Sequence, residues 1–224
     1  RAALPGGASG HSSTVKGWTA LMIAAAKGHL EVVRLLAELG ANVDTPANNG
    51  CTPAWFAAAG GHVEVVRLLA ERGAKVETPQ NESATPAYVA AQNGHMEVVR
   101  LLAELGANVD TPDNDGATPA YIAAQEGHVE VVRVLAELGA NVTATAAGWT
   151  PLKLSVWSSH FHTTKTLLLL GAPPIIEDFM QYSSSRGNTR QLRADLQAWA
   201  ADALTQHRTF HDTFLHGTSA HEGI

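Results

Sequence analysis

The sequence lacks the features that mark a secreted, membrane-spanning or nucleic-acid-binding chain. Cys51 is its only cysteine, so no internal disulfide can form, which fits a reducing compartment. No apolar run approaches the roughly 18 residues that a membrane-spanning helix needs. The 15 lysine and arginine residues are outnumbered by 21 acidic residues and form no basic stripe that could neutralise phosphates. We therefore expect a soluble, cytoplasmic monomer that binds neither nucleic acid nor membranes.

Signatures of catalysis and of cofactor binding are also missing. The sequence has no Cys-x-x-Cys pair, no glycine-rich phosphate loop, and no nucleophile, base and acid at a suggestive spacing. His207 and His211 stand four residues apart, as two metal ligands on a helix would, but Arg208 occupies the position where zinc peptidases have glutamate. We expect no catalytic residue, no cofactor and no metal site. A metal-binding C-terminal tail is the least supported alternative.

What the sequence does contain is a repeat of 33 residues. The string GHxEVVRxLAExGA begins at Gly28 and recurs at Gly61, Gly94 and Gly127. A second string precedes each of these and occurs once more near the end, so five units are visible: Gly17-Trp-Thr-Ala, Gly50-Cys-Thr-Pro, Ser83-Ala-Thr-Pro, Gly116-Ala-Thr-Pro and Gly148-Trp-Thr-Pro. One histidine recurs in every unit, which predicts turn-stabilising groups and not metal ligands: His29, His62, His95, His128 and His160.

Each unit predicts two short antiparallel helices. Thr52 is a suitable N-cap, and Pro53 suits the first helical position, where its missing N–H costs nothing. Gly61 can adopt the left-handed conformation that ends this helix, and a second helix follows to about Arg72. An extended segment then leads through a turn to the next unit. One unit alone cannot bury its valines and leucines, so stacked neighbours must complete the core.

The period, the Thr-Pro pair, the Gly-His turn and the Leu-Leu-Ala pattern resemble the ankyrin repeat. The resemblance implies an all-α solenoid with short β-hairpin fingers over residues 17–174, divided as 17–49, 50–82, 83–115, 116–147 and 148–174. Residues 1–16, rich in Gly, Ser and Ala, are expected to be a disordered lead. Residues 175–224 predict a degenerate repeat and a long capping helix, which would shield the open end of the core.

Because the units are nearly identical, framework positions, which recur in every unit, can be distinguished from positions that vary between units. Glutamates and arginines that recur on the second helix are best explained as solvated pairs. The positions that vary lie at the finger tips and at the end of the first helix, the surfaces by which ankyrin proteins usually hold partners. From these we select the candidate protein-binding residues Trp18, Lys27, Asn49, Cys51, Trp55, Glu82, Tyr88, Gln92, Asn93, Asp115, Tyr121, Gln125, Glu126, Trp149 and Trp157.

Two groups of aromatic candidates leave alternatives open. Two roles explain the tryptophans at these positions equally well, as anchors for a binding partner or as side chains packed locally: Trp18, Trp149 and Trp157. The usual ankyrin string Thr-Pro-Leu-His is altered here, because Ala replaces Leu and an aromatic residue replaces His, which puts the usual histidine hydrogen bond in doubt. For these aromatic residues we favour packing into the volume left by Ala over a peptide-gripping groove: Trp55, Tyr88 and Tyr121.

The first functional hypothesis is a non-catalytic module that binds a protein or peptide on its concave and finger face. The second hypothesis is an engineered, consensus-derived ankyrin scaffold with no natural partner or location, because the units are so alike. The fold alone does not name a target.

Overall fold

The computed structural model describes residues 17–172 and the single residue 194. The predicted disordered lead, the degenerate repeat with its capping helix, and the His207/His211 pair all lie outside the described residues. Within 17–172, ten helices follow one another in five pairs: α1 (Ala20–Ala26) with α2 (Leu30–Glu38), α3 (Pro53–Ala59) with α4 (Val63–Glu71), α5 (Pro86–Gln92) with α6 (Met96–Glu104), α7 (Pro119–Glu126) with α8 (Val129–Glu137), and α9 (Pro151–Trp157) with α10 (Phe161–Leu169).

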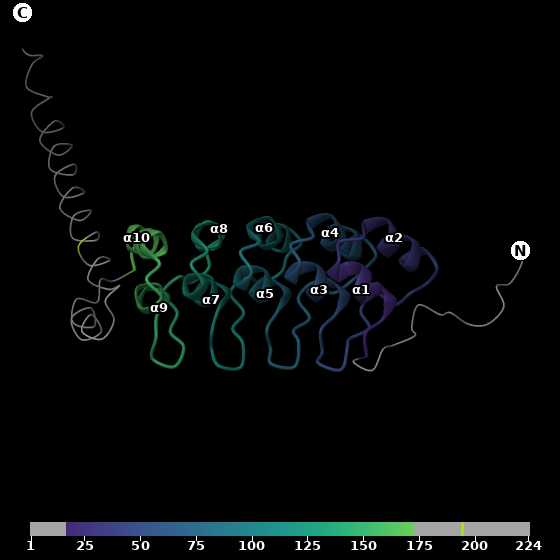
Figure 1. Cartoon of the computed structure of the whole chain (residues 1–224), viewed down its shortest axis with the longest axis horizontal. Helices are drawn as coiled ribbons and strands as arrows, with labels where there is room; N and C mark the ends of the chain where they lie inside the picture. The colour runs from purple at the N-terminus through teal and green to yellow at the C-terminus, as the bar shows by residue number, and fades with distance from the viewer. Residues whose placement is uncertain (1–16, 173–193, 195–224) are drawn as a thin grey trace, which may run out of the picture. The chain divides into compact units, whose positions relative to one another are not determined.

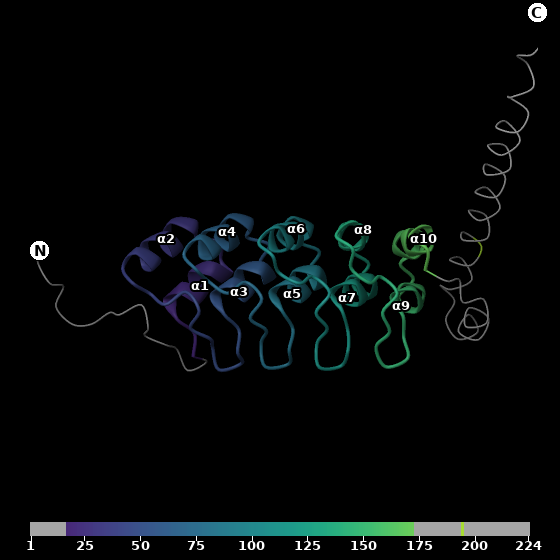
Figure 2. The same ribbon diagram turned by 180° about the vertical axis from the view of Figure 1, so that it is seen from behind.

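The pairs stack so that the first helices form one row and the second helices another (Figures 1 and 2). Loops between successive pairs project beyond the row of first helices, all toward the same side. These loops are the fingers of the predicted solenoid. The all-α repeat architecture expected from the 33-residue period is therefore confirmed.

The first helix of each pair begins at a threonine. In α3 the Thr52 side chain accepts a hydrogen bond from the backbone N–H of Trp55 at 3.2 Å, and Pro53 occupies the first turn. This arrangement satisfies one of the N–H groups that a helix start leaves unpaired. The same cap occurs at every first helix, with the side chains of Thr19, Thr52, Thr85, Thr118 and Thr150 as acceptors.

The turn inside each pair depends on a left-handed residue. Gly61 has φ +72° and ends the segment that includes α3, after which His62 becomes the N-cap of α4. Gly28, Gly94 and Gly127 have the same sign of φ, as the sequence predicts. Ser159 replaces glycine in the fifth unit and still adopts φ +61°, so the turn persists despite the cost of a side chain there.

The histidine after this turn joins neighbouring pairs. Nε2 of His95 lies 3.1 Å from the carbonyl oxygen of Ala59, at the end of the first helix of the preceding unit. His62, His128 and His160 make the equivalent contact with Ala26, Gln92 and Gln125 at 2.9–3.1 Å. The histidines are therefore turn-stabilising groups, as predicted, and they also connect one unit to the next.

The core lies between the two rows of helices and runs from unit to unit. Val66 and Leu69 of α4 are fully buried, and so are Ala57 and Ala58 of α3. Small alanine side chains let neighbouring first helices approach closely, while valine and leucine fill the space beneath the second helices. Each pair supplies only part of this core, so its stability depends on the pairs beside it.

The fingers differ from the predicted β-hairpins. Within residues 17–172 the structure has no β-strand, and the one isolated bridge joins Ala146 to Trp149. Each of the other fingers closes through two backbone hydrogen bonds, such as Gln80 N–H to the Ala84 carbonyl at 3.1 Å and Ser83 N–H to the Gln80 carbonyl at 2.9 Å. The two arms of each finger are hydrogen-bonded to each other only at the turn, so they do not form a ladder of paired strands. No helix in this part of the chain is long and apolar enough to cross a membrane.

Replacing Gly61 with alanine tests the close approach at the Gly-His turn. A Cβ at Gly61 would lie 2.6 Å from Nδ1 of His95, whereas a Cβ at Gly73, with φ +86°, would meet nothing within 4 Å. Gly73→Ala is expected to lower the free energy of unfolding by about 1–2 kcal/mol through the left-handed backbone alone. Gly61→Ala should cost about 1–3 kcal/mol more, because His95 must move. Urea unfolding measures both, and equal losses would contradict the argument.

Candidate functional site

The finger tips, residues 47–50, 80–83 and 113–116, form a continuous edge between the first and the fourth helix pair. Backbone N–H of Asn81 donates to the carbonyl of Asn49 at 2.9 Å, and N–H of Asn114 donates to the carbonyl of Glu82 at 3.3 Å. The Ser83 hydroxyl donates to Oδ1 of Asn114 at 2.6 Å. Because each tip is bonded to the next, side chains on successive tips keep a defined spacing.

The ends of the first helices form a second row beside the fingers. The Asn93 side-chain amide donates to the carbonyl of Ala59 at 3.0 Å, which links α5 to α3. The Gln125 amide donates to the Glu126 carboxylate at 3.3 Å. Their neighbours Lys27 and Gln92 are exposed. Polar groups that differ from unit to unit are therefore presented on helices whose backbones are held in place.

Most of the candidate residues are accessible. Eight are exposed: Lys27, Asn49, Glu82, Gln92, Asn93, Asp115, Glu126 and Trp157. Five more are half-buried: Trp18, Trp55, Tyr121, Gln125 and Trp149. Both groups lie on the fingers or on the first helices.

Two candidates are corrected, because the structure buries them. Cys51 has 1% of its surface exposed and packs with Met22, Ala47 and Phe56. Burial raises the pKa of the Cys51 thiol to about 11, although a hydrogen bond with the Asn49 side chain works in the opposite direction. Tyr88 is 9% exposed, so neither side chain presents a surface to a partner. A position that varies between units can therefore vary inside the core as well as on the surface.

The aromatic row makes contacts with the neighbouring finger. Trp55 Nε1 donates to the carbonyl of Ala84 at 3.1 Å, and the Tyr121 hydroxyl donates to the carbonyl of Ala146 at 3.5 Å. Burial raises the pKa of the Tyr88 hydroxyl, and the nearby Asp113 carboxylate raises that pKa further. Each of the three side chains thus reaches the finger that follows its own helix pair. These contacts favour the packing interpretation over a peptide-gripping groove.

The three tryptophans near the ends of the described segment also make ring contacts. Trp18 meets Phe56 edge-on with ring centroids 4.7 Å apart, so it covers the small cluster around Cys51. Trp149 and Trp157 meet edge-on at 5.8 Å. Trp157 is 45% exposed and presents the larger accessible surface of this pair. Local packing therefore explains the position of the Trp18 side chain, whereas the Trp157 side chain keeps enough exposed surface to contact a partner.

Carboxylates that join adjacent fingers were not found by sequence reasoning. Oδ1 of Asp44 accepts the backbone N–H of Lys75 at 2.8 Å, and Glu77 accepts that of Asn108. Oδ2 of Asp110 accepts the N–H of Asn141 at 3.2 Å. Their spacing of 33 residues was a usable signal, because an acid at one position in three successive units indicates a shared structural task.

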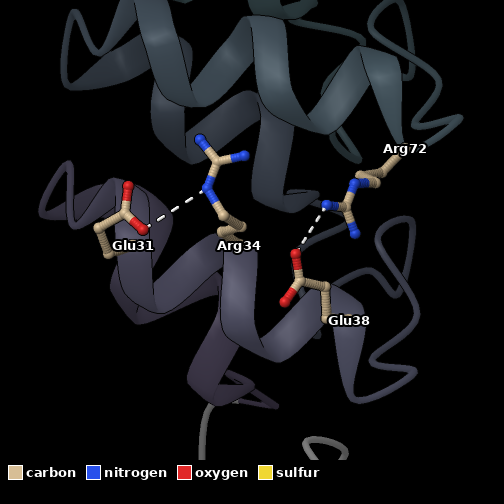
Figure 3. Close-up of polar contacts among 4 residues, drawn as sticks. All are labelled: Glu31, Arg34, Glu38 and Arg72. Atoms are coloured by element: carbon tan, nitrogen blue, oxygen red, sulfur yellow. Dashed lines mark hydrogen bonds and ion pairs between the residues drawn. The ribbon is translucent and has the colours of Figure 1, made fainter.

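The outer surface of the second helices carries the recurring charges. Nε of Arg34 lies 3.5 Å from Glu31 on α2, and Arg72 reaches back to Glu38 of the preceding unit at 3.1 Å (Figure 3). Exposed pairs of this kind contribute roughly 0–1 kcal/mol each. The same few side chains recur along this surface, which therefore offers less to distinguish a partner than the finger side.

Cys51 provides a chemical test of this burial. We expect iodoacetamide to alkylate the folded chain far more slowly than the urea-unfolded chain at mildly alkaline pH. The raised pKa keeps the thiol neutral, and its 1% exposure blocks the reagent. Mass spectrometry at timed intervals gives both rates. Equal rates would show that Cys51 is accessible.

Replacing Trp55 with phenylalanine tests the packing interpretation of the aromatic row. The change removes the indole donor and leaves the Ala84 carbonyl without that bond. We expect the free energy of unfolding to fall by about 1 kcal/mol. Gln92→Ala, which truncates an exposed side chain on α5, is the control and should change it by less than about 0.5 kcal/mol. Identical urea midpoints for the two variants would contradict a packing role.

The described residues contain no group of three or more histidine, cysteine or acidic side chains able to hold a metal ion. The chemistry offered by the finger side is hydrogen bonding, aromatic contact and a few charges on an ordered backbone. Such an arrangement is suited to recognition.

Comparison with known protein families agrees with this architecture. The family described as ankyrin repeats (3 copies) matches the chain over residues 2–80 and again over 76–146. No curated protein matches the chain. The two family matches together span residues 2–146, which is more than half of the 224 residues. This chain therefore belongs to the ankyrin-repeat family.

Proposed function

We propose that this chain is a non-catalytic module that binds a protein or peptide across its finger tips and the ends of its first helices. Ankyrin repeats are generally protein–protein interaction modules. The observation that carries the proposal is the continuous row of exposed, variable side chains on units whose backbones are bonded to one another. Such order before binding reduces the entropy that association costs.

Charge on this surface suggests the character of the partner. Glu82, Asp115 and Glu126 are the exposed charged candidates of the second to fourth units, whereas Lys27 lies in the first unit. Asp113 adds a further carboxylate beside Tyr88 and Tyr121. We therefore propose a partner segment that offers hydrogen-bond donors and positive charge to the central units, with affinity that falls as salt rises.

The engineered-scaffold alternative has less support than the natural-module proposal. An idealised repeat would place glycine wherever φ is positive, yet Ser83, Ala147 and Ser159 have φ of +65°, +49° and +61°. Thr163 is fully buried and its hydroxyl has no hydrogen-bond partner, which designers avoid. Such irregularities are more typical of a natural sequence.

Site-specific photocrosslinking tests the proposed function. A photoreactive amino acid is placed in turn at Glu82, Asp115 and Gln92, all exposed on the finger side. Matched controls carry it at Glu64 and Glu97, which are exposed on the second helices. In extract from the source cells, we expect one crosslinked protein shared by the finger-side positions and absent from the controls.

A second measurement tests whether partner binding depends on the acidic side chains of the finger side. Glu82→Gln with Asp115→Asn should weaken capture of that crosslinked protein several-fold at low salt and reduce its salt dependence. Thermal unfolding of the variant checks that folding is retained. Equal capture from both sides of the molecule, or no shared protein from the finger side, would contradict the proposed function.

A further inference from the structure

Two asparagine–glycine pairs lie on the finger side, Asn49-Gly50 at a finger tip and Asn93-Gly94 at the end of α5. Both asparagines are exposed. An asparagine followed by glycine can lose its side-chain amide spontaneously, because glycine has no side chain to hinder attack by its own backbone nitrogen. The two pairs share this chemistry, and their surroundings decide which of them reacts.

The reaction is a cyclisation followed by hydrolysis. Gly50 loses its amide proton to hydroxide, and its nitrogen attacks Cγ of Asn49, which forms a C–N bond and places negative charge on Oδ1. This intermediate collapses as the Cγ–Nδ2 bond breaks, and ammonia leaves with a proton taken from water. Water then opens the cyclic imide at either of its carbonyls. The net change consumes water, releases ammonia and puts a carboxylate in place of the amide.

At the finger tip, the contacts of the Asn49 side chain favour this reaction. Oδ1 accepts the backbone N–H of Cys51 at 3.3 Å, and a donor at this oxygen stabilises the charge that develops there in the intermediate. The Asn49 amide also hydrogen-bonds with the Cys51 thiol, but sulfur is a weak acceptor, so the leaving nitrogen is held weakly. Asn49 lies in a loop, where backbone rotation breaks no helical hydrogen bond.

The surroundings of Asn93 oppose the reaction. Its Nδ2 donates to the carbonyl of Ala59 in the preceding unit at 3.0 Å, a firmer partner for the leaving nitrogen than a thiol. Asn93 is also the C-cap of α5, with φ −95° and ψ 4°, and its backbone N–H bonds to the Val89 carbonyl. Closing the imide ring rotates ψ away from this near-helical value, so the last turn of α5 must open first.

The attacking nitrogen is restrained at both pairs. The Gly50 N–H donates to the Ala47 carbonyl at 2.9 Å, and the Gly94 N–H donates to the Ala91 carbonyl at 3.3 Å. Freeing either nitrogen costs one backbone hydrogen bond. The asparagine side chain and the helix therefore decide between the two pairs, and both favour reaction at the finger tip.

An aspartate at position 49 would continue a row that the next two fingers already carry. Asn49, Glu82 and Asp115 occupy the same position at intervals of 33 residues, and the first of them alone is neutral. Asp115 precedes Gly116, whose φ of +82° matches the +83° of Gly50. The finger that contains Asp115 thus shows that aspartate followed by glycine fits this turn.

We propose that Asn49 is a spontaneous deamidation site whose reaction gives the row of finger tips a third carboxylate. A partner segment with positive charge then binds the aged chain more tightly than the freshly made one. This effect on binding rests on the proposed function, whereas the reaction itself needs no partner. Opening of the imide at its main-chain carbonyl also lengthens the backbone by one carbon and displaces the carbonyl that accepts the Asn81 N–H at 2.9 Å. Both products carry the new charge.

Timed peptide mass spectrometry of the purified full chain tests the reaction. At mildly alkaline pH and physiological temperature, we expect Asn49 to lose its amide about tenfold faster than Asn93, the rate difference that one firm hydrogen bond supplies. The urea-unfolded chain is the control, because both pairs are then free and should react at similar rates. The proposal is overturned if Asn93 reacts as fast as Asn49 in the folded chain, or if folding preserves the Asn49 amide.

Binding of a labelled oligolysine peptide at low salt tests the effect on recognition. Asn49→Asp reproduces the charge of the product, and Arg67→Gln changes the net charge equally on the outer side of α4. Asn49→Asp should bind the peptide several-fold more tightly than wild type, whereas Arg67→Gln should resemble wild type. Equal binding by the two variants would overturn the effect on recognition. The deamidation rates involve no partner, so failure of the proposed function would leave them unchanged.

Discussion

The contact between a left-handed glycine and the histidine of the following unit is the constraint on which the stack depends. It sets how closely two helix pairs approach, since a Cβ at Gly61 would already lie 2.6 Å from His95. The same histidine binds the carbonyl at the end of the preceding first helix. One small arrangement therefore ends a helix, begins another and joins two units. Its recurrence at one period keeps all the described units in the same register.

Local features of the fold could be predicted from sequence, because they follow from residue types a few positions apart. Threonine caps and left-handed turns are of this kind, and the structure shows them where the strings predict them. Contacts between units were missed when they join side chains to distant backbone. Asp44 bonds Lys75 and Trp55 bonds Ala84, and neither partner is implied by composition or spacing inside one unit. The burial of Cys51 was missed for a related reason: variation between units does not distinguish a small satellite core from the surface.

The described segment presents two surfaces of different physical character. On the finger side, exposed polar side chains lie on backbones joined by hydrogen bonds, so substitutions there are expected to cost little stability. On the second helices, paired glutamates and arginines recur with little change from unit to unit. Variable and recurring side chains thus lie on separate sides of the described units, and a change on one side need not disturb the other.

The cross-unit contacts also bear on how such a chain can change in length over evolutionary time. The histidine contact recurs at all four joints between the described units, and the finger carboxylate recurs at the first three. Duplicating or deleting a whole 33-residue block within the stack recreates the joint that it interrupts, whereas loss of a few residues from one finger separates the carboxylate from its amide. Gene segments of this kind are expected to gain and lose complete blocks, and the finger surface then lengthens or shortens in discrete steps.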